Sequence, residues 1–179
     1  MANTYKMTIA GLERELPICP VSDKLDIAAF VMFSDVEVTV ASAAELLKKC
    51  PDFDIILTAE SKGIPLAFEM ARQSGKSYVV ARKSIKLYMS EPVEVEVKSI
   101  TTANVQKLYL AAEKAELLRG KKVLIVDDVI STGESLKALE TLIQAAGGNI
   151  AAEAAVLAEG DAADRDDIIF LEKLPLFFK

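Results

Sequence analysis

The chain of 179 residues contains no histidine and no tryptophan, and it has only two cysteines. The absence of histidine excludes Ser-His and Cys-His catalysis and every zinc site that uses a histidine ligand. Cys19 and Cys50 each precede a proline and do not form a Cys-x-x-Cys pair. We therefore interpret them as reduced structural thiols of a cytoplasmic protein.

The sequence also lacks long apolar or basic runs. No apolar run approaches the roughly 20 residues of a membrane span, and residues 1–6 do not have the charged and then apolar order of a leader. The formal net charge of −6 disfavours general binding to nucleic acid. A hydrophobic share of 51 % argues against disorder. We expect one domain over residues 1–179, with neither membrane nor nucleic-acid partners.

Strand and helix patterns alternate through the middle of the chain. Residues 54–59 form a continuous apolar run that is typical of a strand covered on both faces. Residues 64–74 are predicted as a helix that ends at Gly75, and residues 77–81 as the next strand. Because two adjacent strands joined through a helix form a parallel unit, we predict an α/β fold with a parallel sheet flanked by helices.

The two ends of the chain differ from this pattern. Residues 1–40 hold prolines and short apolar runs, and residues 160–179 are too apolar for a free end. We predict that these two regions pack together as a small lobe beside a core of about residues 41–159. Within this stretch, residues 36–40 alternate like an extended segment, and residues 41–50 are predicted as a helix with Ser42 as its cap.

A second excursion is expected between the core strands. Residues 93–98 alternate strictly between apolar and charged side chains, and residues 105–110 are suited to pair with them. We predict an antiparallel hairpin whose tip, residues 99–104, is mobile.

The most informative segment runs from Lys122 to Ser135. A buried strand is followed by Asp127 and Asp128, then by a turn of small and hydroxyl residues, and then by an amphipathic helix. Open α/β sheets bind ligands at the carboxyl ends of their strands, and a helix N-terminus behind such a turn can hold a phosphate. One aspartate would suffice to cap the helix, so the pair favours a ligand with a phosphate at one end of a ribose.

Two other predicted strands also end in polar residues. The candidates for a second phosphate or a pyrophosphate are Ser61, Lys62, Gly63, Arg82, Lys83 and Lys86. Because parallel strands end at one edge of the sheet, we expect these residues near the aspartate pair. A solvated turn and a solvated charge run are the alternative interpretations. Phe30, Val31 and Phe33 can stack on a flat ring or pack in the core.

Together these residues carry a family resemblance. The segment from Val123 to Ser135 resembles the signature of type I phosphoribosyltransferases, and the string Arg82-Lys83-x-x-Lys86 is similar to that of adenine phosphoribosyltransferases. The resemblance covers most of residues 50–150. It implies the type I phosphoribosyltransferase fold, with the small lobe as a hood over the base.

The resemblance also implies roles for single residues. Asp127 and Asp128 would hold the ribose hydroxyls of phosphoribosyl diphosphate (PRPP) and serve catalysis. The residues that would bind the 5-phosphate are Ile130, Ser131, Thr132, Gly133, Glu134 and Ser135. Those that would bind pyrophosphate are Ser61, Lys62, Gly63, Arg82, Lys83 and Lys86. Mg²⁺ would arrive with PRPP without a ligand from the chain, the base would lie near Phe30 and Val31, and a homodimer is expected.

The expected reaction is transfer of the phosphoribosyl group to a purine, with adenine favoured, in nucleotide salvage. Adenine enzymes usually carry a Glu-Tyr pair in the loop that closes over the site, where this chain has Asn104 and Val105. Asn104 is therefore a candidate catalytic residue, and transfer to xanthine, hypoxanthine or guanine is an alternative. A PRPP sensor without catalysis is another. A phosphoacceptor receiver domain is disfavoured because too few residues follow Asp128.

Overall fold

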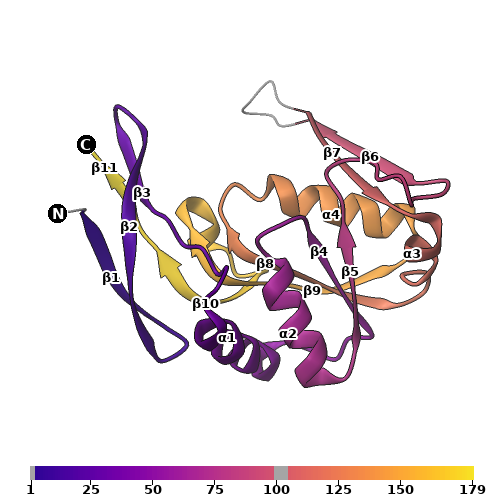
Figure 1. Ribbon diagram of the computed structural model, residues 1–179, viewed down its shortest axis with the longest axis horizontal. Helices are drawn as coiled ribbons and strands as arrows, with labels where there is room; N and C mark the ends of the chain where they lie inside the picture. The colour runs from indigo at the N-terminus through magenta and orange to yellow at the C-terminus, as the bar shows by residue number, and fades with distance from the viewer. Residues whose placement is uncertain (1–2, 99–104) are drawn as a thin grey trace.

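The computed structural model describes residues 3–98 and 105–179. A five-stranded, wholly parallel sheet forms the centre, and a smaller four-stranded sheet lies at one end (Figure 1). In spatial order, the strands of the central sheet are β10 (Ile169–Leu174), β9 (Asn149–Glu159), β8 (Lys122–Ile130), β4 (Ile55–Ala59) and β5 (Ser77–Ala81). The predicted α/β class with a parallel sheet is confirmed.

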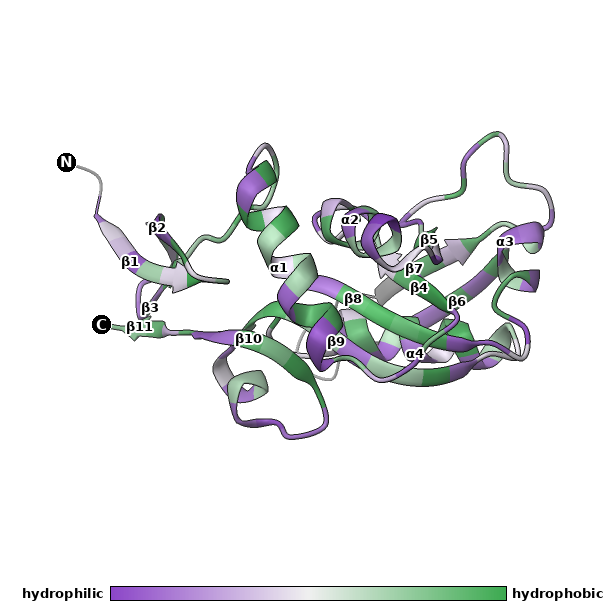
Figure 2. Cartoon of the chain, turned by 90° about the horizontal axis from the view of Figure 1, so that it is seen from below, coloured by the Kyte–Doolittle hydropathy of each residue, from purple (hydrophilic) through white to green (hydrophobic). Residues whose placement is uncertain are grey.

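Helices cover both faces of this sheet (Figure 2). The helices α1 (Val36–Lys49) and α2 (Ile64–Ser74) lie on one face and α4 (Glu134–Ala145) lies on the other. Successive side chains of β4 point to opposite faces of the sheet. Leu57 packs in the α4 layer, and Ile56 packs in the layer of α1 and α2. Among the described residues, no helix is long and apolar enough to cross a membrane.

The predicted hairpin is present and covers α4. Strands β6 (Val93–Lys98) and β7 (Val105–Leu110) are antiparallel, and Val95 and Leu108 share a buried cluster with Leu139 of α4. A short helix, α3 (Ala112–Glu116), leads from the hairpin to β8. Residues 99–104, with the candidate Asn104 and the expected mobile tip, lie outside the described residues.

The small sheet joins the two ends of the chain, and we call it the hood sheet. Its strands, in spatial order, are β1 (Thr4–Ile9), β2 (Leu12–Ser22), β3 (Leu25–Ala28) and β11 (Leu176–Phe178). The rings of Tyr5 and Phe177 meet edge to face with centroids 5.4 Å apart. The chain reaches β11 directly from β10, so the hood sheet is tied to the central sheet at its β10 edge.

Residues 36–40 are helical, contrary to the prediction of an extended segment. They form the first turns of α1, and Asp35 caps the helix by accepting a hydrogen bond from the Val38 N–H at 3.1 Å. Arg14 fixes this carboxylate from β2 through an Nε–Oδ2 contact of 2.7 Å. The predicted cap, Ser42, is buried within the helix. The cap and the burial of Val38 outweigh the strand preference of the β-branched residues.

Candidate active site at the carboxyl edge of the sheet

Two carboxylates lie near the carboxyl end of β8, the middle strand of the sheet. They are within the strand, which continues to Ile130, and not directly after it as predicted. The Asp128 side chain is buried, and its Oδ2 has no hydrogen-bond partner among the described residues. The nearest cation is the Lys62 ammonium, 3.6 Å from this oxygen. Asp127 Oδ1 accepts a hydrogen bond from the Asp128 N–H at 2.8 Å.

The electrostatics of this pair favour a ligand that donates hydrogen bonds. Burial raises the pKa of the Asp127 carboxyl above its ordinary value, the Asp128 charge raises it further, and Lys62 partly opposes both. In residues 3–98 and 105–179, no group of three or more acidic, cysteine or histidine side chains is placed to hold a metal ion. The carboxylate oxygens of this pair can accept hydrogen bonds from a ligand that carries donor groups.

The turn between β4 and α2 packs directly on this carboxylate pair. A Cβ on Gly63 would lie 2.5 Å from Thr58 Oγ1 and 2.9 Å from Asp127 Oδ1, so only glycine fits there. The peptide bond between Glu60 and Ser61 is cis. A cavity of about 200 Å³ forms here, and its lining includes Ser61, Lys62, Lys83, Asp127, Asp128 and Ser135. The structure thus brings together residues from all three of the strand ends predicted to meet.

The basic residues after β5 are organised by Glu60, to which the sequence interpretation gave no role. The Glu60 carboxylate lies 3.7 Å from Arg82 Nη2 and 4.0 Å from Lys86 Nζ, and it accepts a hydrogen bond from the Lys83 N–H at 3.1 Å. Arg82 Nε is buried without a hydrogen-bond partner among the described residues. In the sequence, the only sign of this ion-pair cluster is that an acidic residue, Glu60, stands two positions before Lys62.

The turn from Ser131 to Gly133 leads into α4. Gly133 has a φ of 77° and is the N-cap of the helix, so its backbone takes a conformation that favours glycine. The first N–H groups of α4 follow, and helix N-termini attract anions. Ile130 is buried in the core, so its side chain is directed away from a ligand. Arg165 approaches this turn, since its Nη1 would lie 3.2 Å from a Cβ on Gly133.

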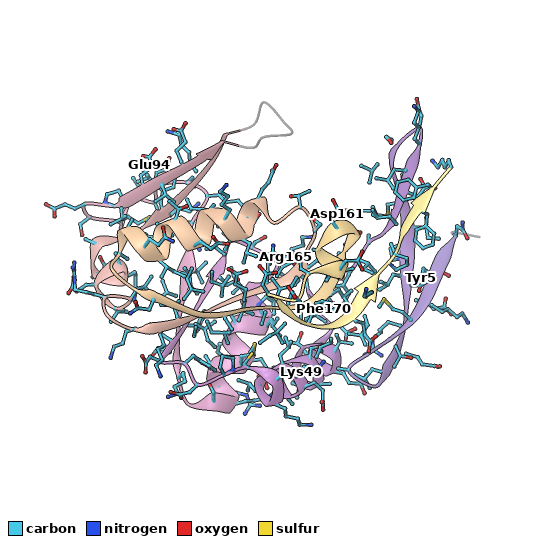
Figure 3. All side chains as sticks on the ribbon, turned by 180° about the vertical axis from the view of Figure 1, so that it is seen from behind. Tyr5, Lys49, Glu94, Asp161, Arg165 and Phe170 are labelled. Atoms are coloured by element: carbon cyan, nitrogen blue, oxygen red, sulfur yellow. The ribbon has the colours of Figure 1, made fainter. Side chains whose placement is uncertain are left out.

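A larger cavity of about 620 Å³ separates this turn from the hood sheet. Its lining comprises Val21, Leu25, Ile27 and Leu176 from the hood sheet, and Ser131, Thr132, Glu159, Gly160, Asp161, Ala162 and Arg165 from the central edge. Figure 3 labels Asp161 and Arg165 at this end of the sheet, near the start of α4. Glu159 and Arg165 were not predicted from the sequence, because nothing in their local pattern distinguishes them from ordinary surface charges.

Phe30 and Val31 occupy different surroundings. Phe30 is 6 % exposed in the core cluster that contains Leu16, whereas Val31 is 51 % exposed. Neither belongs to the described lining of the 620 Å³ cavity, so their contact with a base stays a prediction.

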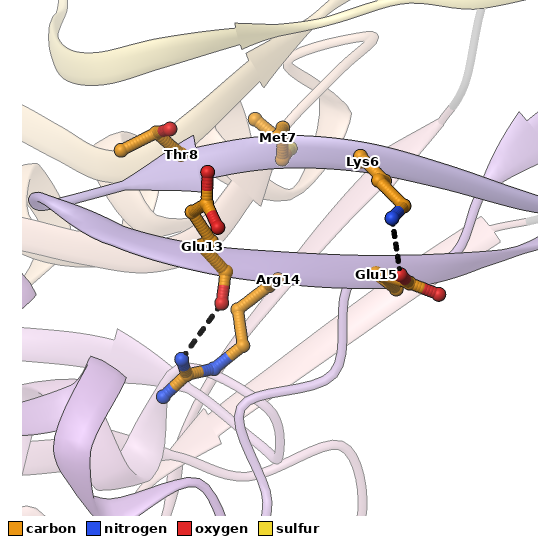
Figure 4. Close-up of a pocket in the computed structure, with 6 residues that line it drawn as sticks. All are labelled: Lys6, Met7, Thr8, Glu13, Arg14 and Glu15. Carbon is orange, nitrogen blue, oxygen red and sulfur yellow. Dashed lines mark hydrogen bonds and ion pairs between the residues drawn. The ribbon is translucent and has the colours of Figure 1, made fainter.

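A separate hollow of about 350 Å³ is formed by residues of β1 and β2 alone (Figure 4). Charges pair with each other there, and Lys6 Nζ lies 2.9 Å from Glu15 Oε1. Among the described residues, its lining shares none with the cavity at the sheet edge.

The fold and the sheet edge define an open α/β protein with a cavity lined by charged and polar side chains at its strand ends, where such sheets bind ligands. The family model described as "Phosphoribosyl transferase domain" matches residues 38–174. The chain belongs to the phosphoribosyltransferase family.

Individual relatives agree with this assignment. The chain is 38 % identical to an adenine phosphoribosyltransferase of Thermotoga neapolitana over 56 % of each chain. It is 31 % identical to a hypoxanthine/guanine phosphoribosyltransferase of Methanothermococcus okinawensis, over 80 % of this chain and 72 % of that protein. The match to the Thermotoga relative spans little more than half of that protein, and the match to an adenine phosphoribosyltransferase of Cenarchaeum symbiosum spans 63 %.

Solved structures share the fold. The crystal structure of adenine phosphoribosyltransferase from Thermoanaerobacter pseudethanolicus has a TM-score of 0.68 at 22 % identity, with 95 % of both chains covered. The enzyme from Saccharomyces cerevisiae has a TM-score of 0.64 at 18 % identity, over 94 % of this chain and 93 % of that one.

Proposed function

We propose that the protein is a purine phosphoribosyltransferase, which transfers the 5-phosphoribosyl group of PRPP to a ring nitrogen of a purine and releases pyrophosphate. The observation that carries this proposal is the pair of buried Asp128 and partly buried Asp127 between the Lys62 turn and the N-terminus of α4. This arrangement offers acceptors for two ribose hydroxyls with an anion site on either side. Membership of the family supports the same reaction.

Each part of the site has a separate task in this reaction. The carboxylates of Asp127 and Asp128 accept hydrogen bonds from the ribose 2- and 3-hydroxyls and orient the sugar. The backbone N–H groups from Ser131 to Ser135 bind the 5-phosphate. Lys62 and Lys83 face the pyrophosphate, whose negative charge increases as its bond to the anomeric carbon breaks.

The same carboxylates also stabilise the ribose ring while it is electron-poor. As pyrophosphate departs, positive charge develops on the sugar ring, and the nearby Asp127 and Asp128 oxygens stabilise that charge. Mg²⁺ bound to PRPP would supply further charge neutralisation at the leaving group. Asn104 stays a candidate catalytic residue in this proposal.

Adenine is the favoured base, and hypoxanthine or guanine is the alternative that the relatives support. A homodimer in the cytoplasm completes the proposal, by analogy with the family that the motifs resemble.

The test is release of pyrophosphate. The purified protein is incubated with PRPP, Mg²⁺ and, in separate reactions, adenine, hypoxanthine, guanine or xanthine. We expect turnover with at least one base, and none in the variant that combines Asp127→Asn and Asp128→Asn. Tight PRPP binding in calorimetry without pyrophosphate from any base would instead establish a PRPP sensor and refute the transferase.

A further inference from the structure

The 620 Å³ cavity has two chemically different walls. Four aliphatic side chains of the hood sheet form one wall, and the polar ends of β8 and β9 form the other. Its volume lies within the range of about 300–1,000 Å³ that small-molecule sites occupy. Because Ser131 and Thr132 line the cavity and also belong to the phosphate turn, a flat base joined to a ribose at Asp127 and Asp128 would enter here.

Glu159 is an acceptor without a donor on the polar wall. It ends β9, the strand beside β8, and its side chain is only partly exposed to solvent. Among the described residues, its carboxylate makes neither a hydrogen bond nor an ion pair. Burial raises the pKa of this carboxyl, and the opposing charge is that of Lys62. Lys62 is already paired with Asp128 at 3.6 Å.

Arg165, the cation in the described lining of this cavity, is also paired. Arg165 donates to Asp167 through Nε at 2.8 Å and Nη2 at 2.7 Å, and Nη2 lies 3.5 Å from Glu153. Its remaining nitrogen, Nη1, is directed at the Gly133 turn and so at the phosphate side of the site. A ligand that displaces water from the Glu159 carboxylate would therefore be favoured if it brings its own donor, such as an N–H group.

We propose that Glu159 determines base specificity by accepting a hydrogen bond from the exocyclic amino group of a 6-aminopurine, and that it rejects 6-oxopurines. This inference rests on the proposed function. A 6-oxopurine would place its carbonyl oxygen against the carboxylate, and two acceptors without a shared proton repel. An amino group donates into the same position with a charge-assisted hydrogen bond.

The experiment compares adenine with hypoxanthine in the wild type, Glu159→Gln and Glu159→Lys, at saturating PRPP. We expect the wild type to prefer adenine in kcat/KM. In Glu159→Gln the ratio of adenine to hypoxanthine should fall at least about tenfold, because an amide can turn its NH₂ group to a carbonyl. In Glu159→Lys hypoxanthine should become the better base. The KM for PRPP should stay within about twofold in Glu159→Gln, which separates base recognition from general damage.

Glu172→Gln is the matched control, because Glu172 is an exposed carboxylate on the adjacent strand β10 and does not line the cavity. Its ratio should equal that of the wild type. The inference is overturned if the wild type prefers hypoxanthine, or if Glu159→Gln leaves the ratio of adenine to hypoxanthine unchanged. Melting temperatures show whether each variant is folded. If Glu159→Lys is unfolded, the result for Glu159→Gln decides the test.

Failure of the proposed transferase function can be distinguished from failure of the inference about Glu159. If no base releases pyrophosphate, binding of AMP and IMP is measured by calorimetry. Tighter binding of AMP in the wild type, with the difference lost in Glu159→Gln, would support the role of Glu159 without catalysis. Equal affinities in the wild type would overturn it.

Discussion

Replacing Gly63 by alanine should damage the site by a mechanism that the structure specifies. The added Cβ would lie 2.5 Å from Thr58 Oγ1, 2.9 Å from Asp127 Oδ1 and 3.2 Å from Asp127 Cα. The first two atoms can rotate away, but the Cα belongs to the central strand and cannot yield. The turn must therefore move off β8 and take Lys62 away from Asp128.

Overpacking of this kind costs about 1–3 kcal/mol in the free energy of unfolding. Moving the Lys62 turn should also weaken PRPP binding by about tenfold or more, which corresponds to about 1.4 kcal/mol. Denaturant unfolding measures the first effect, and calorimetric titration with PRPP and Mg²⁺ measures the second.

Gly11→Ala is the control for this variant. Gly11 turns the hairpin between β1 and β2 at a φ of 83°, and a Cβ there would meet nothing within 4 Å. It should lose stability from backbone strain of about 1–2 kcal/mol yet keep its affinity for PRPP. If Gly63→Ala keeps both its stability and its affinity for PRPP, the contact between the turn and β8 is not what positions Lys62.

Three further outcomes are expected. The variant that combines Asp127→Asn and Asp128→Asn should abolish measurable PRPP binding in calorimetry. Its melting temperature should stay equal or rise, because two adjacent carboxylates repel. Retained affinity would refute their role. Burial and Glu140 raise the pKa of Glu153 to about 7, so this group binds more protons when folded and its contribution to stability falls from about pH 4.5 to pH 7. As the pH rises through that window, the melting temperature of Glu153→Gln should therefore increase relative to that of the wild type. A difference between the two melting temperatures that does not change with pH would contradict this. Asp35→Ala should lower the free energy of unfolding by about 1 kcal/mol, measured by denaturant unfolding, because it removes the cap of α1. Ser42→Ala is the control, because it removes no cap and should not show this loss. A larger loss in Ser42→Ala than in Asp35→Ala would refute the assignment of the cap.

Features set by short-range patterns could be predicted from the sequence. The apolar run at residues 54–59 is a strand because both faces of β4 are covered, and the face of α4 with Leu136 and Leu139 is buried as its spacing indicates. The opposite case is residues 36–40, where β-branched side chains favour a strand in isolation. The helix begins there because Asp35 caps it and Val38 is buried, and the burial and the Arg14 contact that holds Asp35 come from the tertiary structure.

The same distinction applies to the candidate site. Asp127, Asp128 and Lys62 stand at strand ends that a parallel sheet must bring to one edge, so their proximity follows from topology. Glu159 and Arg165 reach the cavity only because β9 is long and the turn after it folds back towards α4. No spacing rule along the chain contains that information, since the other residues of the cavity come from the hood sheet and from the turn before α4.

The charge balance of the site explains how an acidic chain can hold an anionic ligand. The net charge of −6 repels anions at long range, so attraction must come from cations that ligand binding can redirect. Lys62 is such a group, because its contact with Asp128 is 3.6 Å, longer than a hydrogen bond, and half of its side chain is exposed. When Lys62 turns to a pyrophosphate, Asp128 loses its cation and needs a donor, which a ribose hydroxyl on the same ligand provides. The carboxylate pair and the lysine are thus both satisfied by a ligand that carries a phosphate and hydroxyl groups on one sugar.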